Sequence, residues 1–103
     1  MEVRLTKISG RFCDTWDEFK DRQQGLRPGE NLPVNYVAQG ELLAPIEPGK
    51  PILVLRKTRS QEEDIIVEKT GRFKSSPVVT VHESKTGMVV VTENSTYKVE
   101  FVS

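Results

Sequence analysis

The chain has 103 residues, with 15 basic and 15 acidic side chains, so its formal net charge is zero. This length suits a single domain, 1–103, whose core needs no metal or disulfide framework, and zero net charge provides no overall field toward nucleic acid or an anionic membrane. The one cysteine, Cys13, cannot form an internal disulfide, which is compatible with a reducing compartment or with no dependence on the redox state. The first residues lack the apolar run of a signal peptide, and no stretch reaches membrane-spanning length. These features predict a soluble cytoplasmic protein with no membrane partner.

The N-terminal third predicts a strand followed by a short helix. Apolar and polar residues alternate over residues 3–10, which indicates a first short strand. Thr15 and Glu18 have the spacing of a capping box, in which a hydroxyl and a carboxylate hydrogen-bond to amide groups at a helix start. We therefore expect one short helix at about 15–24, with Trp16 packed on the sheet.

Glycine and proline separate the strands predicted for the middle of the chain. Residues 34–38 alternate in polarity as a strand does, and Gly40 is expected to bend that strand. Pro48 and Gly49 suit the central positions of a type II turn, because glycine adopts the positive φ that the second position requires.

Apolar and charged runs predict the elements between residues 51 and 71. Residues 51–55 form a nearly continuous apolar strand, which we expect to be buried on both faces. Thr58–Asp64 is highly charged and is predicted to be a loop. Residues 65–67 are expected to return as the partner strand, and Gly71 indicates a turn or bulge.

The last third predicts three antiparallel strands joined by two tight turns. A turn at Asn94–Ser95 places Val90 opposite Val99, and a turn at residues 84–87 places Val81 opposite Val90. Side chains alternate between the two faces of a strand, so this register separates an apolar face from a half-polar one. The predicted inward-facing residues are Val79, Val81, Met88, Val90, Tyr97, Val99 and Phe101. The predicted outward-facing residues are Thr80, His82, Val89, Val91, Lys98 and Glu100.

Short strands at regular spacing decide the predicted fold class. About six strands, with turn residues about every 8–12 positions, are typical of a small barrel or sandwich. The predicted fold is therefore mainly β: a small antiparallel β-barrel or sandwich of about six strands with one short N-terminal helix at about 15–24. The helix is expected to close an open end or to cover an edge.

Partial matches to catalytic motifs are explained better by turns. Lys85–Gly87 matches the Lys-Thr-Gly triplet of penicillin-recognising enzymes, and Ser95 and Lys98 have the spacing of their nucleophile motif. The order of the two motifs is reversed, and Ser95 is predicted at a hairpin turn rather than on a helix. One histidine, one cysteine and scattered carboxylates give no spacing typical of a metal site, and no glycine-rich phosphate loop is present. The sequence thus predicts no enzyme, no catalytic residue, no cofactor and no metal.

Basic residues in the centre of the chain suggest nucleic-acid binding as an alternative. Arg56 ends one predicted strand, and Arg72 and Lys74 share a face of the next. Such a stripe is suited to phosphates, and aromatic residues on a barrel face stack bases. Against this, the acidic residues Glu62–Asp64 repel a phosphate backbone, and charged strand edges also prevent sheet-to-sheet aggregation. Nucleic acid is therefore a possible partner but not the favoured one.

The outward face of the last three strands supports the favoured hypothesis. Val89 and Val91 stand there among polar residues, and apolar side chains on a half-exposed face indicate a contact surface. We expect a non-catalytic binding module that contacts a protein partner or self-associates. His82 is predicted two strands from Glu100, about 9–10 Å away, so a small ligand-binding or enzymatic barrel around His82 is a second alternative. The candidate binding residues are Arg56, Arg72, Lys74, His82, Val89, Val91, Lys98 and Glu100.

Overall fold

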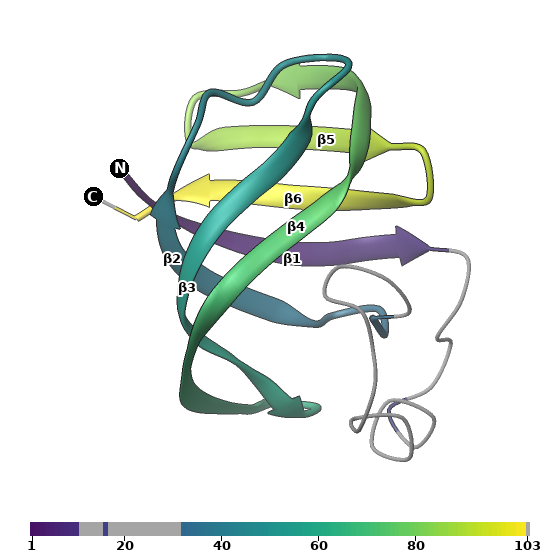
Figure 1. Cartoon of the computed structure of the whole chain (residues 1–103). Coiled ribbons are helices and arrows are strands. Elements are labelled where there is room, and N and C mark those ends of the chain that lie inside the picture. The colour runs from purple at the N-terminus through teal and green to yellow at the C-terminus, as the bar shows by residue number, and fades with distance from the viewer. Residues whose placement is uncertain (11–15, 17–31, 103) are drawn as a thin grey trace.

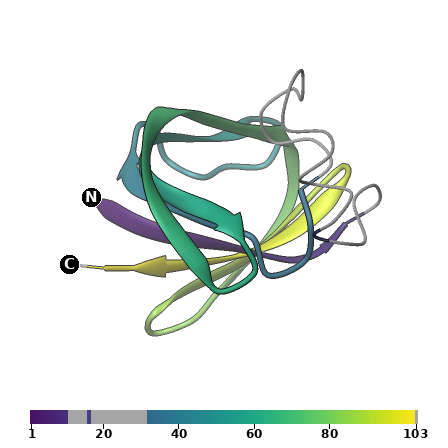
Figure 2. The ribbon, with the colours of Figure 1, turned by 90° about the horizontal axis from the view of Figure 1, so that it is seen from below.

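Six antiparallel strands make up the fold in the computed structural model, which describes residues 1–10, 16 and 32–102. The strands are β1 (Glu2–Gly10), β2 (Val37–Leu42), β3 (Pro51–Glu62), β4 (Ile65–Glu83), β5 (Gly87–Thr92) and β6 (Ser95–Phe101). Each strand pairs with the next along the chain, and β1 also pairs with β6, so the sheet closes into a barrel (Figure 1 and Figure 2). The predicted mainly β fold of about six strands is confirmed.

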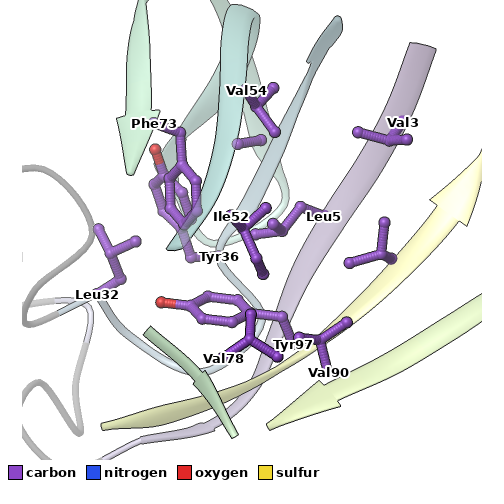
Figure 3. Close-up of a cluster of buried hydrophobic side chains, with 12 residues drawn as sticks. Val3, Leu5, Leu32, Tyr36, Ile52, Val54, Phe73, Val78, Val90 and Tyr97 are labelled. Carbon is purple, nitrogen blue, oxygen red and sulfur yellow. The ribbon is translucent and has the colours of Figure 1, made fainter. Parts of the chain in front are cut away.

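Inward-facing side chains from all six strands fill the barrel. The buried apolar residues, which Figure 3 shows as a cluster, are Val3, Leu5, Leu32, Tyr36, Ala38, Ile52, Val54, Phe73, Val78, Val90, Tyr97 and Val99. Phe73 and Tyr97 meet edge to face, with ring centroids 5.6 Å apart and an interplanar angle of 85°. Burying each large apolar side chain contributes about 1.5–3 kcal/mol, so this interior is the main stabilising feature of the fold.

Gly40 in β2 lies where two strands approach closely. A Cβ atom at this position would lie 2.0 Å from the carbonyl oxygen of Leu55. The β2–β3 register shifts between Gln39 and Gly40, so that Lys57 of β3 has no opposite residue in β2. Such a bulge increases the local twist of a sheet, and it corresponds to the bend predicted at Gly40.

The turn at Pro48–Gly49 is present as predicted. Gly49 has a φ of 88°, and the Lys50 amide donates to the Glu47 carbonyl oxygen at 3.2 Å, as in a type II turn. The Gly49 amide also donates to the Val78 carbonyl oxygen at 2.8 Å, so the turn is held against β4.

The charged segment Thr58–Asp64 is not a loop, and that prediction is wrong. β3 continues to Glu62 and β4 begins at Ile65, so only Glu63 and Asp64 form the turn. Asp64 has a φ of 63°, in the left-handed region that aspartate tolerates. In Figure 1 this turn lies at the bottom of the molecule, below β1, β5 and β6. Charged residues are compatible with strand structure here because the hairpin extends into solvent.

The β5–β6 hairpin differs by two residues from the predicted register. Val90 lies opposite Tyr97, and not opposite Val99 as predicted. The Thr92 hydroxyl donates to the Ser95 carbonyl oxygen at 2.9 Å and accepts from the Ser95 amide at 3.1 Å, so the two residues between them form the turn. A shift of two leaves every side chain on its predicted face, which is why Val90, Tyr97 and Val99 still point inward.

Two residues predicted to face inward, Val79 and Phe101, are exposed. The β4–β5 register shifts between Val78 and Thr80, so Val78 takes the buried position and Val79 faces solvent. Phe101 is the last residue of β6 and lies at the end of the strand, beyond the filled interior. The bulge is a local departure from alternation that a strict two-residue period does not include, whereas Phe101 lies opposite the buried Val3 and keeps the alternation, so that its place at the strand end leaves it exposed.

The apolar strand at residues 51–55 is buried on one face only, which corrects the prediction of burial on both. Ile52 and Val54 are buried, Leu53 is half-buried and Leu55 is 45% exposed. A closed barrel has a single interior, so alternate residues of each strand must face outward.

The helix predicted at about 15–24 lies outside the described residues except for Trp16, and Cys13 lies outside them as well. Trp16 is half-buried and packs against the core, as predicted for this residue. The remainder of the predicted helix stays a prediction.

Candidate functional site

The three basic residues predicted to bind phosphates do not gather on one face. Arg72 lies opposite Leu55 and Arg56 lies opposite Gly71, so Arg56 and Arg72 project from opposite faces of the sheet. The Arg56 Nε donates to a backbone carbonyl oxygen of β4 at 2.9 Å. Of these three basic residues, Arg72 and Lys74 share the outer face of β4, and both are exposed there.

His82 lies on the outer face in line with Lys98 and not with Glu100. His82 pairs with Val89, and Val89 pairs with Lys98. Glu100 lies opposite Gly87, and its carboxylate is 3.9 Å from the Lys98 Nζ. The predicted alignment of His82 with Glu100 is wrong because the β5–β6 register differs by two residues. Among the described residues, no group of three His, Cys, Asp or Glu side chains is placed to hold a metal ion.

Val89 and Val91 lie on the outer face of β5, as predicted. Val89 is 37% exposed, and Val91 is half-buried between Thr80 and Thr96. Across the sheet, Val89 has His82 and Lys98 as its neighbours and Val91 has two threonines, so the two valines form a narrow apolar strip among polar side chains. Such a strip offers little continuous apolar area to a partner.

A second outer apolar surface lies at the end of β2 and on β3. Leu55 and Leu43 are 45% and 47% exposed, and the Leu43 amide donates to the carbonyl oxygen of the half-buried Leu53 at 2.9 Å. Leu53 and Leu55 are two residues apart and therefore share a face. Lys74 lies opposite Leu53, and Arg72 lies opposite Leu55. We call this surface the leucine face: Leu43, Leu53, Leu55, Arg72 and Lys74.

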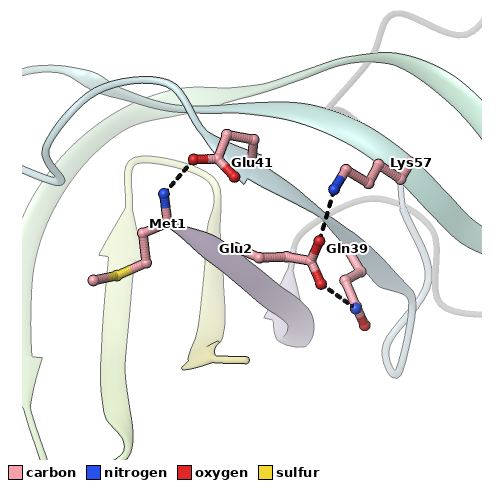
Figure 4. Close-up of polar contacts among 5 residues, drawn as sticks. All are labelled: Met1, Glu2, Gln39, Glu41 and Lys57. Carbon is pink, nitrogen blue, oxygen red and sulfur yellow. Dashed lines mark hydrogen bonds and ion pairs between the residues drawn. The ribbon is translucent and has the colours of Figure 1, made fainter. Parts of the chain in front are cut away.

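The cations of the leucine face are both exposed. Within the described part of the chain, Arg72 and Lys74 have no ion-pair partner. Glu41 lies opposite Leu55 across the sheet, but its carboxylate pairs with the N-terminal amine of Met1 (Figure 4). Among the described residues, no carboxylate therefore pairs with either of these basic side chains.

A separate polar network links β1, β2 and β3, as Figure 4 shows. Glu2 accepts hydrogen bonds from the Lys57 Nζ at 2.8 Å and from the Gln39 Nε2 at 2.9 Å. The hydrogen bond from Lys57 lowers the pKa of Glu2, and the same bond raises the pKa of Lys57. Because the pair lies at the solvent-accessible surface, it adds little to stability. These two charges are therefore paired within the chain, whereas Arg72 and Lys74 have no ion-pair partner among the described residues.

The turn between β3 and β4 carries a further exposed apolar pair. Ile65 and Ile66 are 47% and 49% exposed, and consecutive strand residues point to opposite faces. Glu63 and Asp64 form the turn, and Glu68 follows on β4. All three acidic side chains are exposed, and none has an ion-pair partner among the residues that the structure describes. We call this surface the hairpin tip: Glu63, Asp64, Ile65, Ile66 and Glu68.

Inside the barrel, Lys7 is a buried charged residue that was not predicted from the sequence. It is 1% exposed, and its side-chain amine donates to the carbonyl oxygen of Leu32. A Cβ atom on Gly10 would lie 2.1 Å from the Lys7 Cε, so the glycine makes room for the lysine. The contact links β1 to the segment that precedes β2. The sequence does contain a signal for this burial. Val3, Leu5 and Lys7 are two positions apart on β1, so their side chains lie on the same inward face of the strand.

Of the leucine face, the sequence predicts Arg72 and Lys74 as binding residues but not the exposed leucines, and it does not predict the hairpin tip, although signals for both surfaces are present. Residues 52–55 are all apolar. In an antiparallel barrel, either residues 52 and 54 or residues 53 and 55 therefore have to face solvent. The pair Ile65–Ile66 follows a charged turn, and consecutive apolar residues near a strand end place one side chain on each face.

Comparison of the chain with models of known protein families, with curated proteins and with solved structures finds no match. Within the described residues, no helix is long and apolar enough to cross a membrane. Function is therefore inferred from the surface features of the barrel.

Proposed function

We propose that this protein is a non-catalytic binding module that contacts a protein partner through the leucine face. One observation supports the proposal: Leu43 and Leu55 are each almost half exposed beside two cations that have no ion-pair partner in the described part of the chain. Single exposed apolar residues are common on proteins, whereas a contiguous apolar group is typical of an interaction site. We place the protein in the cytoplasm, because its single Cys13 suits a reducing compartment.

The chemistry of the leucine face defines the kind of partner that fits it. Covering the exposed parts of Leu43 and Leu55 contributes about 1 kcal/mol each from apolar burial. An ion pair to each basic side chain contributes up to about 1 kcal/mol. The partner is therefore expected to present apolar side chains flanked by carboxylates.

Site-specific photo-crosslinking tests this proposal in the cells that make the protein. A photoreactive amino acid replaces Leu55 in one variant and Val89 in a matched control, because both residues are exposed on the outer face of the barrel. We expect the variant at position 55 to form an adduct with one defined polypeptide, which is either another protein or a second copy. No adduct from position 55 in a folded variant would contradict the proposal. An adduct from position 89 alone would assign the contact to the outer face of β5.

Nucleic-acid binding is an alternative because Arg72 and Lys74 are exposed and have no ion-pair partner within the described residues. With only two phosphate contacts, the logarithm of the binding constant would fall with the logarithm of the salt concentration with a slope of only about −2. We expect no retention on a single-stranded DNA resin at low salt. Retention that an Arg72→Gln, Lys74→Gln variant loses would favour this alternative.

A small ligand-binding or enzymatic barrel around His82 remains the second alternative. His82 is exposed and lies in line with Val89 and Lys98. We expect a His82→Ala variant to keep every binding property of the wild type, and a selective loss of binding in that variant would favour this alternative.

A further inference from the structure

We propose that the leucine face binds the hairpin tip of a second copy of this chain. This inference rests on the function proposed above and names its partner. The two surfaces have complementary chemistry. The leucine face presents apolar residues with Arg72 and Lys74, and the hairpin tip presents one isoleucine on each of its two sides, with Glu63 and Asp64 at the turn.

The charges of the two surfaces favour association between copies. Within the described residues, the cations of the leucine face and the carboxylates of the hairpin tip have no ion-pair partner. Opposite charges that meet beside apolar side chains are partly shielded from water, so they interact more strongly than exposed pairs do. The formal net charge of the chain is zero, so copies do not repel each other as a whole.

One molecule cannot satisfy both surfaces by itself. The hairpin tip and most of the leucine face belong to the same two strands, β3 and β4. Leu55 precedes the turn residue Glu63 by eight positions, which is about 25 Å along an extended strand. The paired strands hold the tip away from the face, so the tip can reach only the leucine face of another copy.

The geometry of this contact determines the kind of assembly. Two different surfaces meet, so the contact is heterologous and each bound copy still offers one free tip and one free face. Such a contact builds a ring or a chain rather than a two-fold dimer. The two surfaces are small, and interfaces below about 1,200 Å² are generally weak, so assembly is expected at high protein concentration.

Sedimentation equilibrium of matched variants tests the inference up to about 1 mM protein, as a weak interface requires. The tip variant is Ile65→Ser with Ile66→Ser, and the face variant is Leu43→Ser with Leu55→Ser. The control, Val79→Ser, removes an exposed valine from the outer face of β4. We expect the average mass of the wild type and of the control to exceed that of two copies, and each double variant to have the mass of a monomer.

Mixing the two double variants provides the decisive measurement. The tip variant keeps an intact face and the face variant keeps an intact tip, so an equimolar mixture should form a complex with one copy of each and grow no further. Circular dichroism and urea denaturation of each variant show that loss of association is not loss of folding. A monomeric wild type at about 1 mM, or two folded variants that do not combine, would overturn the inference.

The same measurements separate this inference from the broader proposal. If crosslinking from position 55 yields a different protein while the wild type is monomeric, the leucine face is a binding site but its partner is not a second copy. If crosslinking from position 55 yields nothing and the wild type is monomeric, both proposals fail. Self-association that the face variant retains would also overturn the inference, because the contact would then lie elsewhere.

Discussion

The β5–β6 and β3–β4 hairpins of the barrel differ in how completely their residues are satisfied within the chain. The β5–β6 hairpin is short, with strands of six and seven residues. Its turn is tied to β4, because the Ser76 hydroxyl donates to the Thr92 Oγ1 at 2.8 Å and the Glu93 amide donates to the Pro77 carbonyl oxygen at 3.1 Å. The β3–β4 hairpin has strands of 12 and 19 residues, and register shifts interrupt its pairing at three points.

The two hairpins also differ in how deeply their apolar side chains are buried. The β5–β6 hairpin places Val90, Tyr97 and Val99 in the interior and hydrogen-bonds its turn to the neighbouring strand. The β3–β4 hairpin leaves Leu55, Ile65 and Ile66 about half exposed. Substitutions in the first hairpin should therefore reduce stability, and those in the outer positions of the second should change association and leave stability nearly unchanged.

The largest expected loss of stability follows from Gly87→Ala in β5. The added Cβ atom would lie 2.0 Å from the Val99 carbonyl oxygen, so the paired backbones of β5 and β6 have to separate. We expect the free energy of unfolding in urea to fall by about 3 kcal/mol or more. The control is Gly49→Ala, where no atom lies within 4 Å of the added Cβ but φ is 88°, and it should cost only about 1 kcal/mol. Equal losses in the two variants would contradict this explanation.

A smaller loss is expected from Thr92→Val at the β5–β6 turn. The buried Thr92 hydroxyl exchanges two hydrogen bonds with the backbone of Ser95 and accepts a third from Ser76. Valine has the same shape but leaves these groups without partners, so urea denaturation should show a loss of about 1–3 kcal/mol. Thr80→Val, at an exposed position of β4, should change stability by less than about 0.5 kcal/mol. A Thr92 variant as stable as the Thr80 variant would show that the hydroxyl does not determine this turn.

Tyr97→Phe is expected to cost about 1 kcal/mol near neutral pH, because the hydroxyl loses its hydrogen bond with Ser95. Burial raises the pKa of Tyr97 to about 12, an effect that the Ser95 hydrogen bond partly opposes. Above the ordinary tyrosine pKa of 10.0, the unfolded chain loses this proton while the folded chain keeps it. The stability of the wild type therefore decreases as the pH rises toward 12.

The pH dependence distinguishes the wild type from the phenylalanine variant. Between about pH 9 and pH 11, the wild type should lose about 1 kcal/mol more than the variant, as measured by urea denaturation at each pH. Parallel losses in the two proteins would mean that Tyr97 does not stay protonated in the folded state over this range.

The smallest effect on stability is expected at the hairpin tip. Ile65→Ser with Ile66→Ser removes side chains that are about half exposed, so the urea midpoint should stay close to that of the wild type, within about 0.5 kcal/mol. The same variant should lose self-association, which reverses the pattern expected for the β5–β6 hairpin. A loss of stability above about 2 kcal/mol would indicate that the isoleucines belong to the folded core.

The sequence predicts much of the fold but little of the candidate site. Alternation in polarity identifies Val90, Tyr97 and Val99 as interior residues, and the turn chemistry of Pro48–Gly49 predicts the turn that is observed. The outer apolar residue Leu55 is missed, because an apolar run does not indicate which of its two faces meets the core. The surface formed by Leu55 and Arg72 exists only through the pairing of β3 with β4.

Neighbouring positions in the sequence specify the mainly β class, the number of strands and the inward positions of Val90, Tyr97 and Val99, because these depend on local alternation and turn residues. The tertiary structure decided closure of the barrel, the β5–β6 register and the bulge that turns Val79 outward. Each of these depends on contacts between residues that are distant in the chain, such as Ser76 with Thr92. For the same reason, only the folded barrel brings three leucines together on one face with two cations that have no ion-pair partner among the described residues.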